Sequence, residues 1–211
     1  MLLNAFVIVW RESLEAMLVI GILAAWAEGR GGRVRGGLWA GVAAGVALAL
    51  ALAAVMQGAL GSLSDQGQEI FQTSLILFAA VLMTHMVLWM RRHARGLRRA
   101  MEGALDRAAE QRGAWGIAAV AAVAVAREGA ETVIFLQGMA SGAGWSALLP
   151  SASAGFLLAA FTAWAAARGL RLLPQYQVLR VSACLLLLFA AGMLVLGTDR
   201  LVGMEWIPPG P

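Results

Sequence analysis

The sequence predicts an all-α, polytopic membrane protein with six transmembrane helices. Three observations support this fold class. Hydrophobic residues make up 61% of the 211 positions and charged residues only 13%, about half the share typical of soluble domains. The mean hydropathy is +0.77, and several apolar stretches approach the roughly 20 residues that a helix needs to cross a bilayer. All sixteen basic residues are arginines, and nearly all of them lie between apolar stretches.

Six apolar segments define the expected helices. They lie at residues 2–27, 37–57, 70–90, 114–137, 145–167 and 177–197. The first segment has no basic n-region and contains Arg11, Glu12 and Glu15 where a signal peptide should be uninterrupted, so we expect it to be retained as a helix. Together the segments form a single transmembrane domain over residues 1–211.

The arginines predict the orientation of these helices. Thirteen of the sixteen fall in the loops after the first, third and fifth segments, most of them in an arginine-rich loop at about 91–113. Because basic loops stay in the cytoplasm, we expect the N-terminus and the tail at 198–211 to face outwards. The net charge of +4 therefore reflects membrane orientation and contact with anionic lipid, and it does not indicate a nucleic-acid partner.

Two of the apolar segments contain the same charged motif, R-E-x-x-E. At about 100° per residue, the arginine and both glutamates of a motif project from one arc of the helix. The arginine and the second glutamate, at i and i+4, can form an ion pair, which leaves the first glutamate free for another partner. Counted at about 1.5 Å per residue, both motifs fall near the bilayer midplane. The motifs consist of Arg11, Glu12 and Glu15, and of Arg127, Glu128 and Glu131.

Charges at this depth are costly and need an explanation. Each costs roughly 2.5–3.5 kcal/mol, so three in one helix approach about 8–10 kcal/mol, and we expect the two motif helices to be buried against each other. Four carboxylates with no thiolate form a hard oxygen site, which favours Mg²⁺, Ca²⁺, Mn²⁺ or iron over Cu⁺. The alternative is a structural membrane subunit in which the arginine–glutamate pairs only latch helices together.

The spacing of the motifs also predicts an internal repeat. Arg11 and Arg127 are 116 positions apart, and each motif helix opens a group of three segments, at about 1–95 and about 114–197. Because three is odd, the second group enters the membrane from the opposite side, which gives two inverted three-helix repeats. Transporters of this kind bind their solute near the midplane at the repeat interface. The pattern therefore predicts a solute path.

At these residues the sequence resembles the high-affinity iron permease family, which contains fungal ferric permeases and bacterial ferrous-uptake permeases. The family hallmark is a paired R-E-x-x-E motif in the first and fourth transmembrane helices, and both copies are complete here. The stretches at 69–72 and 84–95 are also similar to the family. The resemblance implies a permease for iron and not an enzyme. It implies that iron is bound by Glu12, Glu15, Glu128 and Glu131, with Arg11 and Arg127 orienting these carboxylates.

The resemblance has further implications for partners and location. It implies a bacterial inner-membrane protein that receives iron from a separate oxidase or a periplasmic iron-binding protein. Iron is then the transported ion, and no intrinsic cofactor is expected, because the chain has no copper- or haem-ligand set. Family members usually have a seventh helix, and this chain stops after the sixth, either as a natural short form or by truncation. The same site suits other hard or divalent cations, such as manganese or lead, and this alternative stays open.

Three more residues are candidates for an accessory site. Asp65 and Glu69 belong to the mildly acidic outward side, which would concentrate cations or is merely solvated. Members of the family often have a second acid where this chain has Gln72. His85 in the third segment is either a ligand or proton relay, or a histidine hydrogen-bonded within the bundle.

Several other residues favour a structural interpretation. The glycines Gly37, Gly41 and Gly45 have the spacing that allows close helix packing in lipid. Met86 is expected to pack in the apolar interior, and Trp89 is expected to anchor its helix at the membrane interface. Gln137, six positions after the second motif, is a weaker candidate for the solute path and is not one of the predicted ligands.

Overall fold

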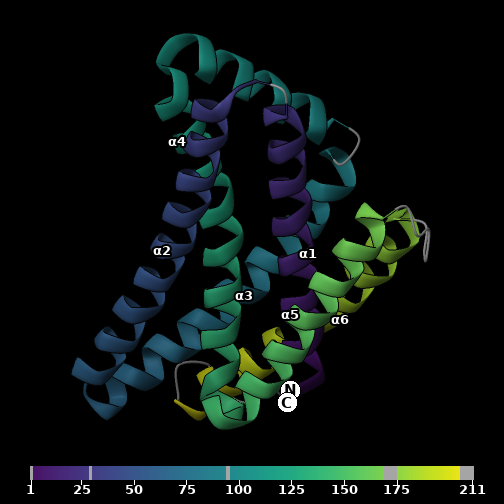
Figure 1. The fold of residues 1–211 in the computed structure, drawn as a ribbon. Helices are drawn as coiled ribbons and strands as arrows, with labels where there is room; N and C mark the ends of the chain where they lie inside the picture. The colour runs from purple at the N-terminus through teal and green to yellow at the C-terminus, as the bar shows by residue number, and fades with distance from the viewer. Residues whose placement is uncertain (1, 29, 94–95, 169–174, 205–211) are drawn as a thin grey trace.

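The computed structural model describes residues 2–28, 30–93, 96–168 and 175–204, and all regular secondary structure in these ranges is helical. Six helices form an elongated bundle (Figure 1). They are α1 (Leu2–Ala27), α2 (Gly32–Ser62), α3 (Asp65–His93), α4 (Leu97–Ala143), α5 (Trp145–Ala167) and α6 (Gln175–Gly203). The all-α fold class predicted from composition is confirmed.

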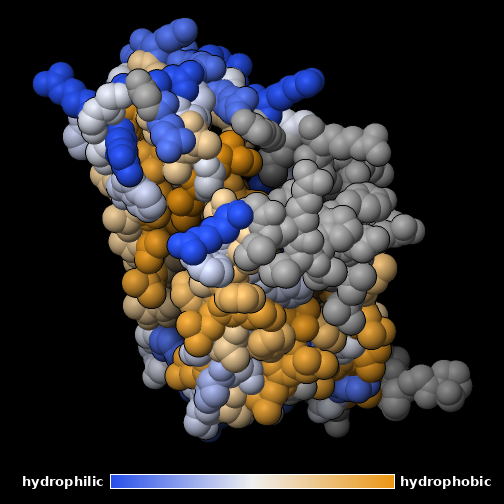
Figure 2. Space-filling view, turned by 45° about the vertical axis from the view of Figure 1, so that its right-hand side comes forward, coloured by the Kyte–Doolittle hydropathy of each residue, from blue (hydrophilic) through white to orange (hydrophobic). Residues whose placement is uncertain are grey.

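Four helices are long and apolar enough to cross a bilayer on length and composition alone, namely α2, α3, α5 and α6. The other two, α1 and α4, each carry the three charges of a motif and lie against each other in the bundle. Apolar residues dominate the visible side of the bundle, and hydrophilic residues gather at one end (Figure 2). The protein is therefore a polytopic helical membrane protein.

The packing of the helices follows a symmetrical scheme. The two motif helices run in opposite directions, α1 upwards and α4 downwards in Figure 1. α2 packs on α4, α5 packs on α1, and α3 packs on α6. If the first three helices are exchanged for the last three, this list of contacts is unchanged. Such a scheme is what two inverted repeats would produce, and the repeat itself stays a prediction.

Small residues allow α2 and α4 to approach closely. Three glycines of α2 face the backbone of α4, and a Cβ atom at Gly45 would lie 2.8 Å from the Ala122 carbonyl oxygen. On the other side of the bundle, Gly155 of α5 has the same relation to the Phe6 carbonyl of α1. The prediction that the glycine series serves helix packing is confirmed. The three glycines of the series are Gly37, Gly41 and Gly45.

The segment at 91–113, expected as a loop, is mostly helical. α4 begins at Leu97, and Gly113, with φ 56° and ψ −137°, kinks it before its apolar part. Residues 97–112 are rich in alanine, arginine and glutamate, which are good helix formers. Leu105 of this amphipathic stretch is fully buried against α1 and α2, and the stretch lies across the end of the bundle (Figure 1). Hydropathy did not predict it because it detects only segments apolar enough to cross a membrane.

The helices also extend beyond their predicted ends. α2 covers Gly32–Ser62 where 37–57 was expected, because helical hydrogen bonding continues beyond both ends of the most apolar stretch. α6 continues to Gly203, so the first part of the predicted tail at 198–211 is helical. The rest of that tail, from 205 onwards, lies outside the described residues.

A polar contact holds the amphipathic stretch to α1. The Trp26 indole Nε1 donates a hydrogen bond to Asp106 Oδ1 at 2.9 Å. The Arg30 guanidinium lies 4.2 Å above the Trp26 ring and 3.6 Å from Asp106 Oδ1. This contact fixes residues 97–112 over the end of the space between α1 and α4.

Candidate metal centre

The first motif lies on the inner face of α1, and its charged side chains are buried. Only 3% of Arg11 is exposed. Its Nη1 lies 2.9 Å from Glu12 Oε1, and its Nη2 lies 2.7 Å from Glu15 Oε1. The predicted i,i+4 ion pair is therefore present, but the first glutamate is paired with the arginine as well. Met86 of α3 completes these contacts, since its Sδ accepts a hydrogen bond from Arg11 Nη1 at 3.1 Å.

The second motif lies on α4 and has looser surroundings. Arg127 Nε donates to Glu131 Oε1 at 3.0 Å, which is the ion pair that the spacing predicts. The Arg127 side chain is 47% exposed, and its guanidinium lies 5.0 Å above the ring of Trp89. The ion pair leaves Glu128 for another partner, again as predicted from helix geometry.

Carboxylates from the two motif helices meet inside the bundle. Ligand oxygens of Glu12, Glu15 and Glu128 all lie within 4.8 Å of one another, and all three residues are buried. We refer to these three residues as the carboxylate cluster. Glu131 is also buried, but it lies outside this group of three and is paired with Arg127.

The spacing of the cluster matches the coordination sphere of one ion. Oxygens on opposite sides of a Mg²⁺ or Ca²⁺ ion lie about 4–5 Å apart, twice a metal–oxygen distance of about 2.0–2.6 Å. Among the described residues, Glu12 Oε2 and Glu128 Oε2 have no hydrogen-bond donor. A buried acceptor without a partner is costly, and a hard cation would supply the missing partner.

A cavity of about 560 Å³ adjoins the cluster. Glu15, Arg127 and Glu128 contribute its polar lining, and the rest of its lining is mostly apolar. It is also lined by four residues of α4 and three of the amphipathic stretch, namely Ala119, Val120, Val123, Ala124, Ala100, Met101 and Ala104. The cavity therefore connects the motif level with the arginine-rich end of the bundle.

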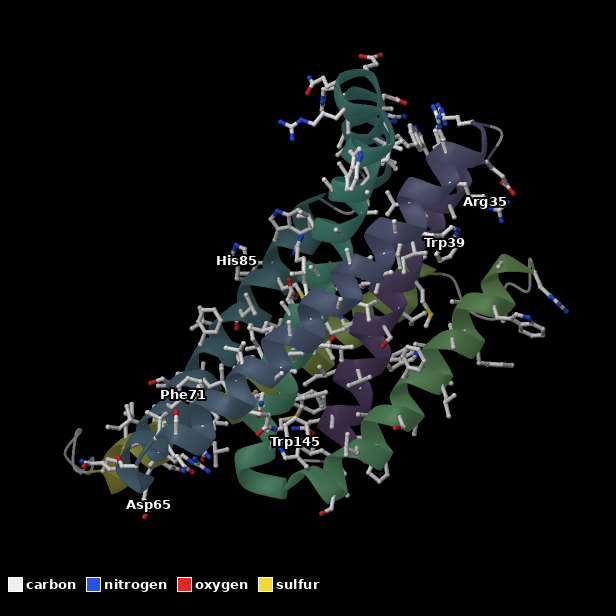
Figure 3. All side chains as sticks on the ribbon, turned by 60° about the vertical axis from the view of Figure 1, so that its left-hand side comes forward. Arg35, Trp39, Asp65, Phe71, His85 and Trp145 are labelled. Atoms are coloured by element: carbon white, nitrogen blue, oxygen red, sulfur yellow. The ribbon has the colours of Figure 1, made fainter. Side chains whose placement is uncertain are left out.

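The accessory candidates lie apart from the cluster. Asp65 is in the first turn of α3 and is exposed, as is Glu69 one turn later. His85 is exposed on the outer side of α3 (Figure 3). None of the three belongs to the carboxylate cluster, and a role for them in binding stays a prediction.

Two residues of α3 contact the motifs in ways that sequence reasoning missed. Met86 accepts a hydrogen bond from Arg11, and the ring of Trp89 lies beneath Arg127 instead of serving only at the membrane interface. Their spacing of three residues places both on one face of the helix. Methionine and tryptophan are ordinary residues in an apolar helix, so only this spacing could have pointed to a shared role.

Comparison with known families identifies the family to which the chain belongs. The sequence profile described as "Iron permease FTR1 family" matches residues 2–206, which is nearly the whole chain. The chain belongs to this family. The family membership agrees with the resemblance seen in the two motifs, and the matched range includes both of them.

Relatives of this FTR1-family chain include bacterial permeases. It is 33% identical over 134 residues to the ferrous iron permease EfeU of Yersinia pestis, a match covering 62% of this chain and 48% of that protein. It is 36% identical over 135 residues to the ferrous iron permease EfeU of Escherichia coli O6:H1 (strain CFT073), covering 62% and 49%. The chain spans about half the length of the curated relatives it matches. No solved structure matches it.

Proposed function

We propose that the chain is an iron permease, and that iron crosses the membrane through the carboxylate cluster. The family and the names of its relatives support iron as the transported ion. The observation that carries the proposal is the convergence of Glu12, Glu15 and Glu128 from two antiparallel helices to within 4.8 Å. The protein would then act as a transporter without chemical catalysis.

In this proposal each charged residue has a defined part. The three clustered glutamates bind the ion, and Glu131 is the fourth, outer ligand that becomes available when Arg127 moves away. Arg11 and Arg127 orient the carboxylates and limit the excess negative charge. Four acids and two arginines leave a formal charge of −2 when all are ionised, which suits a multivalent cation.

The arrangement of charges at the two ends supports an orientation of the chain in the membrane. Arginines outside the apolar segments, such as Arg33, Arg35 and Arg112, lie at the end that the 560 Å³ cavity approaches. If that end is cytoplasmic, as the distribution of arginines predicts, iron moves inwards and leaves the cluster through the cavity. We place the chain in a bacterial inner membrane with its N-terminus outside.

The competing function is that of a structural membrane subunit in which the arginine–glutamate pairs only latch helices together. The ion pairs of Arg11 with Glu12 and Glu15, and of Arg127 with Glu131, are compatible with it. It predicts that neutralising a motif glutamate impairs assembly of the bundle, whereas the permease function predicts loss of uptake by a folded protein. Transport of another hard or divalent cation through the same cluster remains an alternative, which competition by manganese and lead during iron uptake would test.

In this proposal, separate proteins deliver iron to the permease. We propose a separate oxidase or a periplasmic iron-binding protein as the source, as the family resemblance implies. The chain itself serves as the membrane path, and iron is its substrate, with no resident cofactor.

Iron accumulation in proteoliposomes tests the proposal. Wild type is compared with Glu12→Gln and Glu128→Gln, which keep side-chain shape and remove a charged ligand. We expect uptake to fall about 100-fold or more in both variants, because each loses a ligand of the buried site. Glu110→Gln, an exposed position on the amphipathic stretch, is the matched control and should retain normal uptake.

The amount and the folded state of each variant are measured in parallel by size-exclusion chromatography in detergent. Folded Glu12→Gln and Glu128→Gln proteins that transport iron at the wild-type rate would refute the proposal. Loss of assembly in both variants would favour the structural function instead.

A further inference from the structure

A second cavity, with a polar lining, lies at the end of the bundle opposite the arginine-rich end. Its volume is about 330 Å³, and it is enclosed by α2, α3, α4 and the start of α5. Trp145 of its lining lies at the same end as Asp65, away from Arg35 (Figure 3). Four glutamines from three helices line it, and none of its described lining residues is charged. We refer to it as the amide pocket, and its glutamines are Gln57, Gln68, Gln72 and Gln137.

Gln137 is the residue of this pocket that packing alone does not explain. Only 4% of it is exposed, and it stands between the buried residues Phe135 and Met139 of the apolar core. Its side-chain Nε2 has no hydrogen-bond partner among the described residues. An unpaired buried polar group destabilises the fold, so we expect this amide to have a hydrogen-bond partner within the adjoining pocket.

Two of the other glutamines, Gln68 and Gln72, each use one side-chain polar atom in a hydrogen bond. Gln68 Nε2 donates to the Leu63 carbonyl at 3.2 Å, which leaves its Oε1 for the pocket. Gln72 Oε1 accepts from Arg200 Nη1 at 3.4 Å, which leaves its amide nitrogen. The pocket therefore offers both acceptors and donors. This mixture suits water molecules, of which the pocket has room for several at about 30 Å³ each.

Three features follow one another along α4. The 560 Å³ cavity is lined by residues between 119 and 128, the motif occupies 127–131, and the amide pocket is lined by Gln137 and Ala140. At about 1.5 Å per residue, Gln137 lies about 9 Å beyond Glu131 along the helix axis. On α3 the sequence order is reversed, but the two spaces lie on the same sides of the motifs. Gln68 and Gln72 line the pocket, whereas Met86 and Trp89 line the cavity.

The chemistry of the lining determines the state of an ion that it can hold. A neutral lining does not compensate a divalent ion for the loss of its water shell, so such an ion stays hydrated there. Amide groups bind the coordinated and surrounding waters, and contacts mediated by water are nearly as favourable as direct ones. The negatively charged cluster, by contrast, can replace water ligands directly.

We propose that the amide pocket is an outer subsite, which holds the hydrated metal ion before the ion loses water at the carboxylate cluster. This inference rests on the proposed transport function. An outer subsite must bind weakly enough to release the ion onwards, and neutral amides meet this requirement better than carboxylates. The acidic residues Asp65 and Asp199 at this end of the bundle outnumber Arg200, and this excess of negative charge favours the approach of cations.

Initial rates of iron uptake at varied iron concentration provide the first test. Gln137→Met keeps the side-chain volume and removes the polar atoms, and it should fold at least as stably as wild type. We expect its KM to rise about tenfold with a maximal rate within about twofold of wild type, because only the first binding step is weakened. Gln66→Met, an exposed glutamine of α3 outside the pocket, is the matched control and should leave KM unchanged.

A second test reports on the pocket without transport. Gln68→Cys is introduced into a Cys184→Ser background, which removes the exposed native thiol. A water-soluble methanethiosulfonate reagent labels the new thiol, and Mn²⁺ is added as a redox-stable probe. We expect millimolar Mn²⁺ to slow labelling severalfold, both with Glu128 intact and in a Glu128→Gln background, because the outer subsite fills independently of the cluster.

The two tests separate this inference from the proposed function. If Glu128→Gln still transports iron but Mn²⁺ slows labelling, the amide pocket remains a cation site and the role of the cluster is wrong. An unchanged KM in Gln137→Met, or a labelling rate that does not depend on Mn²⁺, overturns the inference and leaves the pocket as a space that holds only water.

Discussion

The arginines of the two R-E-x-x-E motifs occupy the same motif position but have different surroundings. Arg11 is 3% exposed and is paired with Glu12, with Glu15 and with the sulfur of Met86. Arg127, with a 47% exposed side chain, pairs with Glu131 and lies over an aromatic ring beside the 560 Å³ cavity. Equal motifs therefore do not imply equal roles.

The difference suggests a division of work between the two motif helices. We expect motif one to be the rigid side of the site. Arg11 contacts Glu12, Glu15 and Met86, and both glutamates belong to the carboxylate cluster. Motif two is the adjustable side, since the half-exposed Arg127 pairs with Glu131 of its own helix and adjoins the 560 Å³ cavity. We expect the ion to alter the contacts of motif two more than those of motif one.

The largest expected effect separates the two arginines by stability. Arg11→Met leaves two buried carboxylates without their counter-charge, and we expect a loss of about 3–5 kcal/mol in the free energy of unfolding. Arg127→Met removes a half-exposed pair and should cost about 1 kcal/mol or less. Both are measured by denaturation in detergent, with recovery of folded protein as the readout if Arg11→Met does not accumulate. Equal losses of unfolding free energy in the two variants would contradict the assignment of motif one as rigid and motif two as adjustable. Arg99→Met, at an exposed position outside the motifs, is the control.

The second prediction separates the glutamates by their affinity for metal. Binding of Mn²⁺, followed by electron paramagnetic resonance, should weaken about 100-fold in Glu15→Gln, because a cluster ligand is lost. In Glu131→Gln it should weaken about tenfold or less, because this residue lies outside the group of three. A larger loss in Glu131→Gln than in Glu15→Gln would place the ion nearer to motif two than the cluster indicates.

The smallest expected effect concerns the aromatic contact of Arg127. Trp89→Leu removes a cation–π contact of about 0.5–1 kcal/mol, and we expect the uptake rate to change severalfold. Trp89→Phe keeps a ring and should restore most of the rate. Trp164→Leu removes a similar contact, with Arg168 at 4.5 Å, outside the motifs. If it changes iron uptake as much as Trp89→Leu does, Trp89 has no specific role at the site.

Much of the candidate site could be predicted from the sequence because its residues contradict their surroundings. Six charges inside two apolar segments are visible without any structure, and helix geometry correctly places Arg127 and Glu131 in an ion pair. The pairing of Arg11 with the adjacent Glu12 could not be predicted. It depends on the side-chain conformation that close burial against α3 and α4 imposes.

The amphipathic stretch at 97–112 and the amide pocket had weaker signals. The amphipathic stretch is not apolar enough to be recognised as a membrane crossing, and the glutamines of the amide pocket carry no charge that would mark them as a site. Gln137 is one polar residue in an apolar helix, and its importance depends on glutamines of α2 and α3 that are more than sixty positions away.

The sequence by itself determined that this chain is helical, lies in a membrane, carries two matching charged motifs and belongs with the iron permeases. These properties follow from local composition and from the 3.6-residue period of the helix, and both can be read along the chain. Only the tertiary structure decided which three glutamates meet, which arginine is enclosed and where the polar cavities lie. The reason is that these properties depend on how closely neighbouring helices approach, and small residues such as Gly41 and Gly155 set that distance across the whole bundle.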